Sequence, residues 1–216
     1  MQKNVGYVHV AFDQNVFTMN IDKIDDPRHR VLDAYNVLRK EDYGFACHAV
    51  REGLDLFEKL FGFHSKSMIA PCYLWDSEIE KVAFENGVRF IQSGNAQRPS
   101  IYAKSQGARI KHHYTGQKNK LGQVYTIRNC TFEPSYYKCD NEDSCMKAIE
   151  NAFKFYKPAI VCSHRQNFIG ELNPANRDGN LLEFQKLLKH IVNKYPDVEF
   201  MSSDQLGKII EIDHDK

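Results

Sequence analysis

The residues best suited to chemistry stand at the end of one apolar stretch. Residues 158–162 are continuously apolar, and the chain then changes abruptly to a polar segment that contains His164, Arg165 and Asn167. Such a run is typical of a strand in a covered parallel sheet, and active sites form at the carboxyl edge of such sheets. Strand alternation places His164 on the same side as Cys162 and Arg165 on the other. The pattern indicates either proton transfer to a substrate by the imidazole, or a polar loop with a capping histidine.

A second apolar stretch ends in aromatic residues and a carboxylate. Segment 69–76 contains Tyr73, Trp75, which is the only tryptophan, and Asp76. Aromatic faces beside a carboxylate suit a sugar ring, which has an apolar C–H face and a hydroxyl rim. Tyr73, Trp75 and Asp76 are therefore candidate substrate-binding residues, with helix capping as the alternative role for Asp76.

The remaining carboxylates and histidines do not form a local metal motif. Asp140 and Asp143 stand near the start of an expected helix, where acids complement the helix dipole. Glu133 follows a strand end, and the sequence assigns it no partner. His48 and Glu52 would share a helix face, as surface pairs commonly do. No single segment therefore has the spacing of a metal site.

Composition limits the class of protein. The 216 residues suit one domain, with 42% hydrophobic and 26% charged residues and a net charge of +1. This balance excludes a disordered polyelectrolyte and indicates no nucleic-acid partner. No apolar run approaches the roughly 18 residues of a membrane span, and the first residues lack the apolar stretch of a signal peptide. The six cysteines include no Cys-x-x-Cys pair. We therefore expect a soluble cytoplasmic protein whose cysteines are mostly buried thiols.

The expected elements alternate between strands and helices. Apolar residues recur at helical spacing from Val50 to Phe61, with Gly62 as the C-terminal cap. Ser77 and Glu80 have the spacing of a capping box that opens a helix. Strands are expected at 5–12, 66–72, 88–91, 124–128, 158–162 and 198–201, further helices at 27–40, 146–156, 181–191 and after 202, and a long loop at 93–120. This order predicts an α/β fold with parallel strands and crossover helices.

Several segments together carry a family resemblance. Residues 52–62, 69–75, 87–92, 157–170 and 196–206 resemble the polysaccharide deacetylase (NodB-like) superfamily, particularly the bacterial polysaccharide (de)acetylases of the Bacteroidetes type. The likeness covers about residues 44–210 and implies one domain, an irregular (β/α)7-type barrel with parallel strands. It also implies a divalent metal, Zn²⁺ or similar, that an Asp and two His hold and that activates water. Another Asp then acts as base, and a late-strand histidine protonates the leaving group.

The match to the family's motifs is uneven along the chain. His164 matches the late histidine, with Cys162 where the family usually has leucine, whereas Ile69 stands where the family has arginine. The metal-binding strand at the start of family members and their His-x-x-x-His segment do not occur in this sequence. Segment 11–14 resembles that strand only faintly. Barrels of this general kind more often have about 250 residues. We therefore expect a barrel that is incomplete at its N-terminus and assign no metal ligands.

The resemblance implies a carbohydrate-active hydrolase that removes N- or O-acetyl groups from a polysaccharide or glycan precursor, with His164 as general acid. The residues expected to contact the acetylated glycan are Tyr73, Trp75, Asp76, Arg165 and Asn167. Two alternatives remain. One is a metal-free, non-catalytic glycan-binding or scaffold protein of the same fold. The other is a glycoside hydrolase that uses a carboxylate pair such as Asp76 and Glu133.

Overall fold

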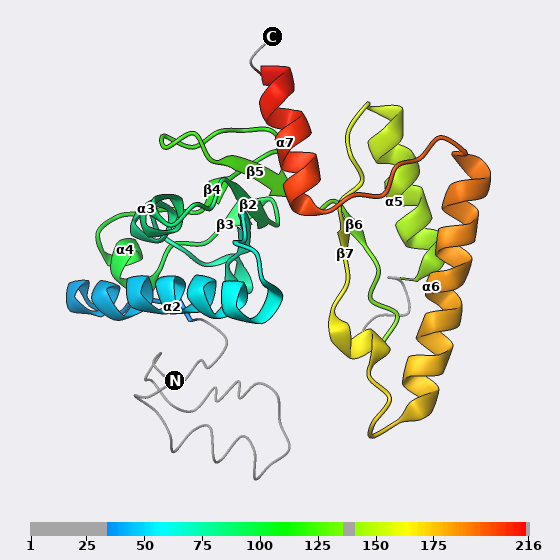
Figure 1. Cartoon of the computed structure of the whole chain (residues 1–216), viewed down its shortest axis with the longest axis horizontal. Helices are drawn as coiled ribbons and strands as arrows, with labels where there is room; N and C mark the ends of the chain where they lie inside the picture. Colours follow the sequence, from blue (N-terminus) through cyan, green and yellow to red (C-terminus); the bar gives the residue numbers. More distant parts are fainter. Residues whose placement is uncertain (1–33, 136–140, 215–216) are drawn as a thin grey trace. The chain divides into compact units, whose positions relative to one another are not determined.

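The computed structural model describes residues 34–135 and 141–214, so the strand expected at 5–12 lies outside the described residues. The chain divides into two compact units, one ending at Tyr125 and one running from Thr126 to His214 (Figure 1). Helices accompany parallel strand pairs in both units, which confirms the expected mixed α/β class. The sheets of the described residues are open, and closure into a single barrel domain stays a prediction.

Unit 1 is built on a three-stranded sheet in the order β1-β2-β5, in which β1 and β2 are parallel. A two-stranded antiparallel sheet joins β3 and β4. The elements of unit 1 in chain order are η2 (Lys40–Asp42), α2 (Tyr43–Phe61), β1 (Ser67–Ile69), η3 (Pro71–Tyr73), α3 (Ser77–Glu85), β2 (Phe90–Ser93), β3 (Ala96–Gln97), α4 (Ile101–Ser105), β4 (Lys111–His112) and β5 (Val124–Ile127). Strand β5 spans the boundary between the two units.

Helix α2 forms as its apolar spacing predicts. Val50 and Leu54 are buried on one face, and α2 packs against α3. Gly62 ends the helix in the left-handed conformation, with φ 75°, and donates its N–H to the carbonyl of Glu58 at 2.8 Å. A residue with a Cβ atom is strained in this conformation, so the glycine sets the end of the helix.

Three sequence-based element predictions are wrong. Residues 93–120 contain β3, α4 and β4 rather than one long loop. Within the helix expected at 27–40, residues 34–39 form turns and bends, and residues 27–33 lie outside the described range. Residues 198–201 form no strand, and Phe200 is 61% exposed. An apolar run becomes a strand only where a neighbouring strand accepts its hydrogen bonds, and none of the described strands pairs with this run.

A buried carboxylate organises unit 1. Glu80, which is 8% exposed, accepts hydrogen bonds from Trp75 Nε1 at 2.9 Å, Tyr125 Oη at 2.6 Å and Asn119 Nδ2 at 3.1 Å. The predicted capping box is therefore wrong, because the Glu80 side chain turns into the core. A buried carboxylate is tolerated when such donors satisfy it.

An imidazole lies beside this carboxylate network. The half-buried His113 ring stacks on Tyr125, with ring centroids 3.9 Å apart, and faces Trp75 at 6.4 Å. Its Nε2 and Nδ1 contact the side-chain oxygens of Gln97 and Gln117 at 2.8 and 3.1 Å. Burial lowers the pKa of His113, although the hydrogen bond to the Gln117 oxygen and the Glu80 charge oppose this effect. Unit 1 therefore disfavours the protonated form of this ring.

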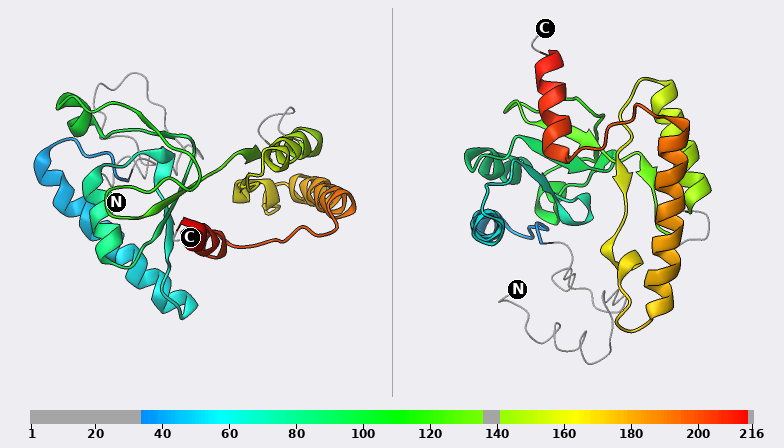
Figure 2. Two further views of the ribbon diagram at one scale, coloured as in Figure 1. Left: turned by 90° about the horizontal axis from the view of Figure 1, so that it is seen from above. Right: turned by 45° about the vertical axis from the view of Figure 1, so that its right-hand side comes forward.

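Unit 2 places two long helices against a parallel strand pair. Its elements are β6 (Cys130–Thr131), α5 (Glu142–Lys154), β7 (Val161–Cys162), η4 (Arg165–Phe168), α6 (Pro174–Lys194) and α7 (Ser203–His214). Figure 2 shows α5 and α6 side by side. The buried core draws on β6, α5 and α6 and consists of Cys130, Phe132, Cys145, Met146, Ile149, Leu187 and Ile191. The helix expected after residue 202 is confirmed by α7.

The Glu80 network predicts a large loss of stability on truncation. In Glu80→Ala three donors lose their acceptor, so we expect the free energy of unfolding of unit 1 to fall by about 3 kcal/mol. Urea unfolding followed by the fluorescence of Trp75, the only tryptophan, measures it. The control is Glu78→Ala, because Glu78 is exposed and, within the described part of the chain, accepts a side-chain hydrogen bond from the neighbouring Ser77 hydroxyl rather than from core donors. Equal stability of the two variants would contradict the assigned role of Glu80.

The lowered pKa of His113 predicts a pH dependence. As the pH falls below about 6.5, the unfolded chain takes up a proton that the folded unit resists, so the stability of unit 1 falls. We expect the Trp75-monitored stability to decrease more from pH 7 to pH 5.5 in the wild type than in His113→Gln. Parallel pH profiles for the two proteins would show that His113 does not contribute.

Candidate functional site

The candidate site lies just beyond the ends of β6 and β7, whose register brings its residues together. The two strands are parallel, and Thr131 is aligned with Cys162. The alignment continues beyond the strands, because the Phe132 N–H donates to the Cys162 carbonyl at 2.9 Å. Glu133 lies two residues after Thr131, and His164 lies two residues after Cys162. Since side chains alternate with a period of two, Glu133, Cys162 and His164 share one face.

Glu133 and His164 form a hydrogen-bonded pair. The Oε1 atom of Glu133 lies 2.6 Å from Nδ1 of His164. The Glu133 side chain is 7% exposed, whereas that of His164 is 62% exposed. An ionised carboxylate only accepts hydrogen bonds, so the imidazole carries a proton on Nδ1 and its neutral form has the lone pair on Nε2. The pair therefore offers an exposed imidazole in a defined tautomer.

Asn167 holds the Glu133 carboxylate through its second oxygen, Oε2. It is fully buried, and its Nδ2 donates to Glu133 Oε2 at 2.8 Å. The same amide group also contacts Ser163 Oγ and the His164 carbonyl, and its Oδ1 accepts from the Ser135 N–H at 3.2 Å. Both oxygens of Glu133 are thus held by protein donors. Asn167, a residue predicted to contact the glycan, is therefore buried and holds the pair in place.

Helix α6 supports the turn that carries Asn167. The Asn176 amide donates to the carbonyls of Gln166 and Ile169, each at 3.0 Å. Asn180 donates to the Asn167 carbonyl at 2.8 Å. Two asparagines spaced four residues apart thereby hold the η4 backbone, which has too few residues to satisfy its own carbonyls. The spacing of Asn176 and Asn180 is the signal in the sequence that could have revealed this support.

A sulfur atom completes the cluster. The half-buried Cys162 accepts a hydrogen bond from Nη1 of Arg128 at 3.3 Å. One ligand atom each from Glu133, Cys162 and His164 lies within 4.8 Å of the others, so the three residues could hold a metal ion. Spacing along the chain does not reveal this cluster, because its residues come from two separate segments.

The cluster does not fit the metal arrangement that the resemblance implies. In the deacetylase arrangement, the Asp and the two His that hold the metal are different residues from the late-strand histidine. Across residues 34–135 and 141–214, the one group of three or more suitable side chains includes His164 itself. A histidine whose lone pair binds a metal cannot accept a proton at that atom. The described residues therefore offer no metal site that excludes His164 as a ligand, and segment 11–14 and Asp140 lie outside them.

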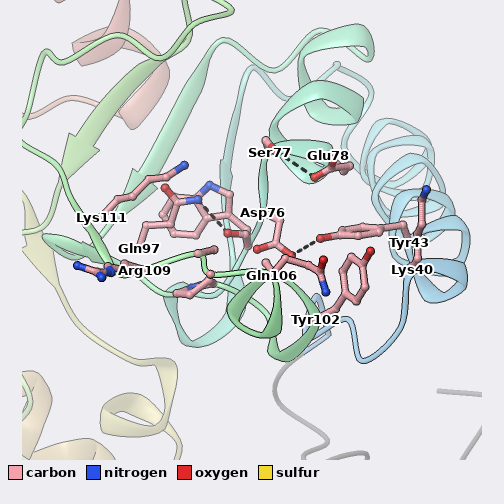
Figure 3. Close-up of a pocket in the computed structure, with 15 residues that line it drawn as sticks. Lys40, Tyr43, Asp76, Ser77, Glu78, Gln97, Tyr102, Gln106, Arg109 and Lys111 are labelled. Atoms are coloured by element: carbon pink, nitrogen blue, oxygen red, sulfur yellow. Dashed lines mark hydrogen bonds between the residues drawn. The ribbon is translucent and has the colours of Figure 1, made fainter.

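Unit 1 contains a pocket of about 730 Å³ whose lining includes Trp75 and Asp76, two of the predicted substrate-binding residues (Figure 3). Asp76 is buried there and accepts from Tyr43 Oη at 2.7 Å and from the Ser100 N–H at 3.0 Å. It precedes α3 but makes no capping hydrogen bond. Trp75 is 1% exposed, and its indole N–H is occupied by Glu80. Both oxygens of Asp76 thus have donors within unit 1.

The other two candidate residues lie in different settings. Tyr73 is half-buried and its ring lies against Gly94, where an added Cβ would approach to 2.9 Å. Its own backbone has φ 53°, an uncommon conformation for a residue with a side chain. Arg165 directly follows His164 at the start of η4 and is exposed. Arg165 is therefore the predicted glycan-contacting residue that adjoins the Glu133–His164 pair.

Comparison with known proteins gave no relatives: no family model, no curated protein and no solved structure matches this chain. None of the described helices combines the length and the apolar character that crossing a membrane requires.

The geometry predicts the tautomer of His164. We expect its neutral form to be protonated on Nδ1, which nitrogen-15 NMR of the ring measures directly. His48 is the matched control, because it is equally exposed at 62% but contacts Glu52 through Nε2, at 3.3 Å. A His164 ring protonated mainly on Nε2 would contradict the hydrogen bond to Glu133.

Proposed function

We propose that this chain is a hydrolase that removes acetyl groups from a glycan, with His164 as the residue that moves the proton. The observation that carries the proposal is the 2.6 Å contact between Glu133 and His164 beyond the ends of two parallel strands. A buried carboxylate that holds an exposed imidazole in one tautomer is a common arrangement for acid–base catalysis. The resemblance of the segment around His164 to deacetylases supports acetyl groups as the substrate class.

The reaction requires one proton to move twice. Nε2 of His164 accepts a proton from a water molecule as the water oxygen attacks the acetyl carbonyl. The same proton then passes to the leaving oxygen or nitrogen of the sugar when its bond to the acetyl carbon breaks, which releases acetate. His164 is thus base in the first step and general acid in the second.

The neighbours of His164 support this cycle. The imidazole is positively charged between the two steps, and the carboxylate of Glu133 stabilises that charge at 2.6 Å. Asn167 keeps Glu133 in place through Oε2. Arg165 is exposed beside His164 and can donate hydrogen bonds to sugar hydroxyl groups. No step passes through a metal, because the one candidate metal cluster of the described residues uses His164 itself as a ligand.

Acetate release from acetylated oligosaccharides, both N-acetylated and O-acetylated, tests the proposal. We expect His164→Ala to lower kcat/KM by about 100-fold or more, because the group that transfers the proton is lost. Glu133→Gln removes the charge that stabilises the imidazolium, and we expect a loss of at least 10-fold.

The control is His190→Ala. His190 on α6 forms a similar pair with Glu142, at 2.8 Å, and its side chain is 47% exposed. We expect its activity to stay within about twofold of the wild type. Undiminished activity in His164→Ala would refute the proposed role, and glycan binding without acetate release would favour the non-catalytic alternative.

A further inference from the structure

The three side chains of the cluster have the donor chemistry of a zinc site. Glu133 supplies a carboxylate oxygen, Cys162 a sulfur and His164 a ring nitrogen, and Zn²⁺ binds each of these groups in proteins. Three protein ligands also leave a fourth position for water. The mixed donor set disfavours Mg²⁺ and Ca²⁺, which prefer oxygen ligands alone.

The distances require only a small adjustment. The three ligand atoms lie within 4.8 Å of one another, whereas ligands around tetrahedral zinc are about 3.3–3.7 Å apart. An ion therefore needs a shift of about 1 Å: the widest pair must approach, and if Nδ1 is the ligand, the Oε1 and Nδ1 atoms, which are 2.6 Å apart, must separate slightly. His164 can supply such a shift, because its side chain is 62% exposed and adjoins an exposed Arg165.

The surroundings suit a bound ion. Asn167 holds Glu133 through Oε2. Oε1 lies at the cluster, where it accepts from Nδ1 of His164, so a bound ion takes the place of that hydrogen bond. Arg128 donates to the Cys162 sulfur, and its positive charge complements the negative charge that sulfur carries as a metal ligand. Cys162 is half-buried, whereas Cys130 and Cys145 are buried in the core.

We propose that Glu133, Cys162 and His164 bind a Zn²⁺ ion, and that this ion inhibits the hydrolysis by occupying the imidazole. If zinc binds Nε2, it takes the lone pair that accepts the proton from water. If it binds Nδ1, the remaining proton moves to Nε2, which becomes a donor instead of an acceptor. Either way His164 loses its proton-accepting atom. The inhibitory part rests on the proposed hydrolase function, whereas metal binding does not.

Metal binding is tested on the full chain after treatment with a chelator. We expect one equivalent of Co²⁺ to produce a near-ultraviolet sulfur-to-cobalt absorption band, and Zn²⁺ to abolish that band by displacement. Cys162→Ser should lose the band and weaken Zn²⁺ binding by about 100-fold or more. His164→Ala should also weaken binding, as a second variant that removes a different ligand.

The control for metal binding is Cys72→Ser, because Cys72 is an exposed cysteine of unit 1. This variant should keep both the band and the wild-type affinity. A wild type without the band, or a Cys162→Ser variant with wild-type affinity, would overturn the metal site.

Inhibition is tested by dividing the rate of acetate release in the presence of a chelator by the rate at saturating Zn²⁺. We expect a ratio of at least 10 for the wild type and a ratio near 1 for Cys162→Ser at the same Zn²⁺ concentration. A wild type that shows full zinc occupancy and unchanged acetate release would overturn inhibition. A wild type that binds zinc but releases no acetate under either condition would refute the hydrolase and its inhibition, and the metal site would stand.

Discussion

The in-register pairing of β6 with β7 is the constraint on which the candidate site depends. Thr131 is aligned with Cys162, and the residues two positions later, Glu133 and His164, therefore meet on one face. A shift of one residue in either strand would turn one of the two side chains to the opposite face. That face is occupied by the core, where Cys130 and Phe132 pack against α5 and α6. Burial of the apolar side chains thus holds the polar pair in position.

Both units contain a buried carboxylate, and the hydrogen-bond networks of the two carboxylates differ in whether they include an exposed side chain. Glu80 in unit 1 accepts from an indole, a phenol and an amide, all of them part of the core network. Glu133 in unit 2 accepts from one buried amide and from an imidazole that is mostly exposed. A fully enclosed network stabilises a fold, whereas a network that ends in an exposed titratable ring can act on a substrate. This difference favours unit 2 as the site of chemistry.

Local sequence patterns predicted many helices and strands correctly. The stripe from Val50 to Phe61 and its glycine cap correspond to α2, because helical spacing and a left-handed terminus are properties of adjacent residues. The run at 198–201 did not become a strand, because a strand needs a partner that local spacing cannot supply. Glu80 likewise has the spacing of a capping residue, but the Trp75 and Tyr125 donors draw it into the core.

The sequence by itself determined many of the local elements and the position of His164 at a strand end, because these depend on side-chain periodicity and on an abrupt change of polarity. Only the tertiary structure decided that Glu133 is the partner of His164, 31 residues away, and that Asn167 and Arg128 support the cluster. These contacts depend on strand register and on the return of the chain through α5. Register is set by packing between distant segments, so spacing within any one segment cannot reveal it.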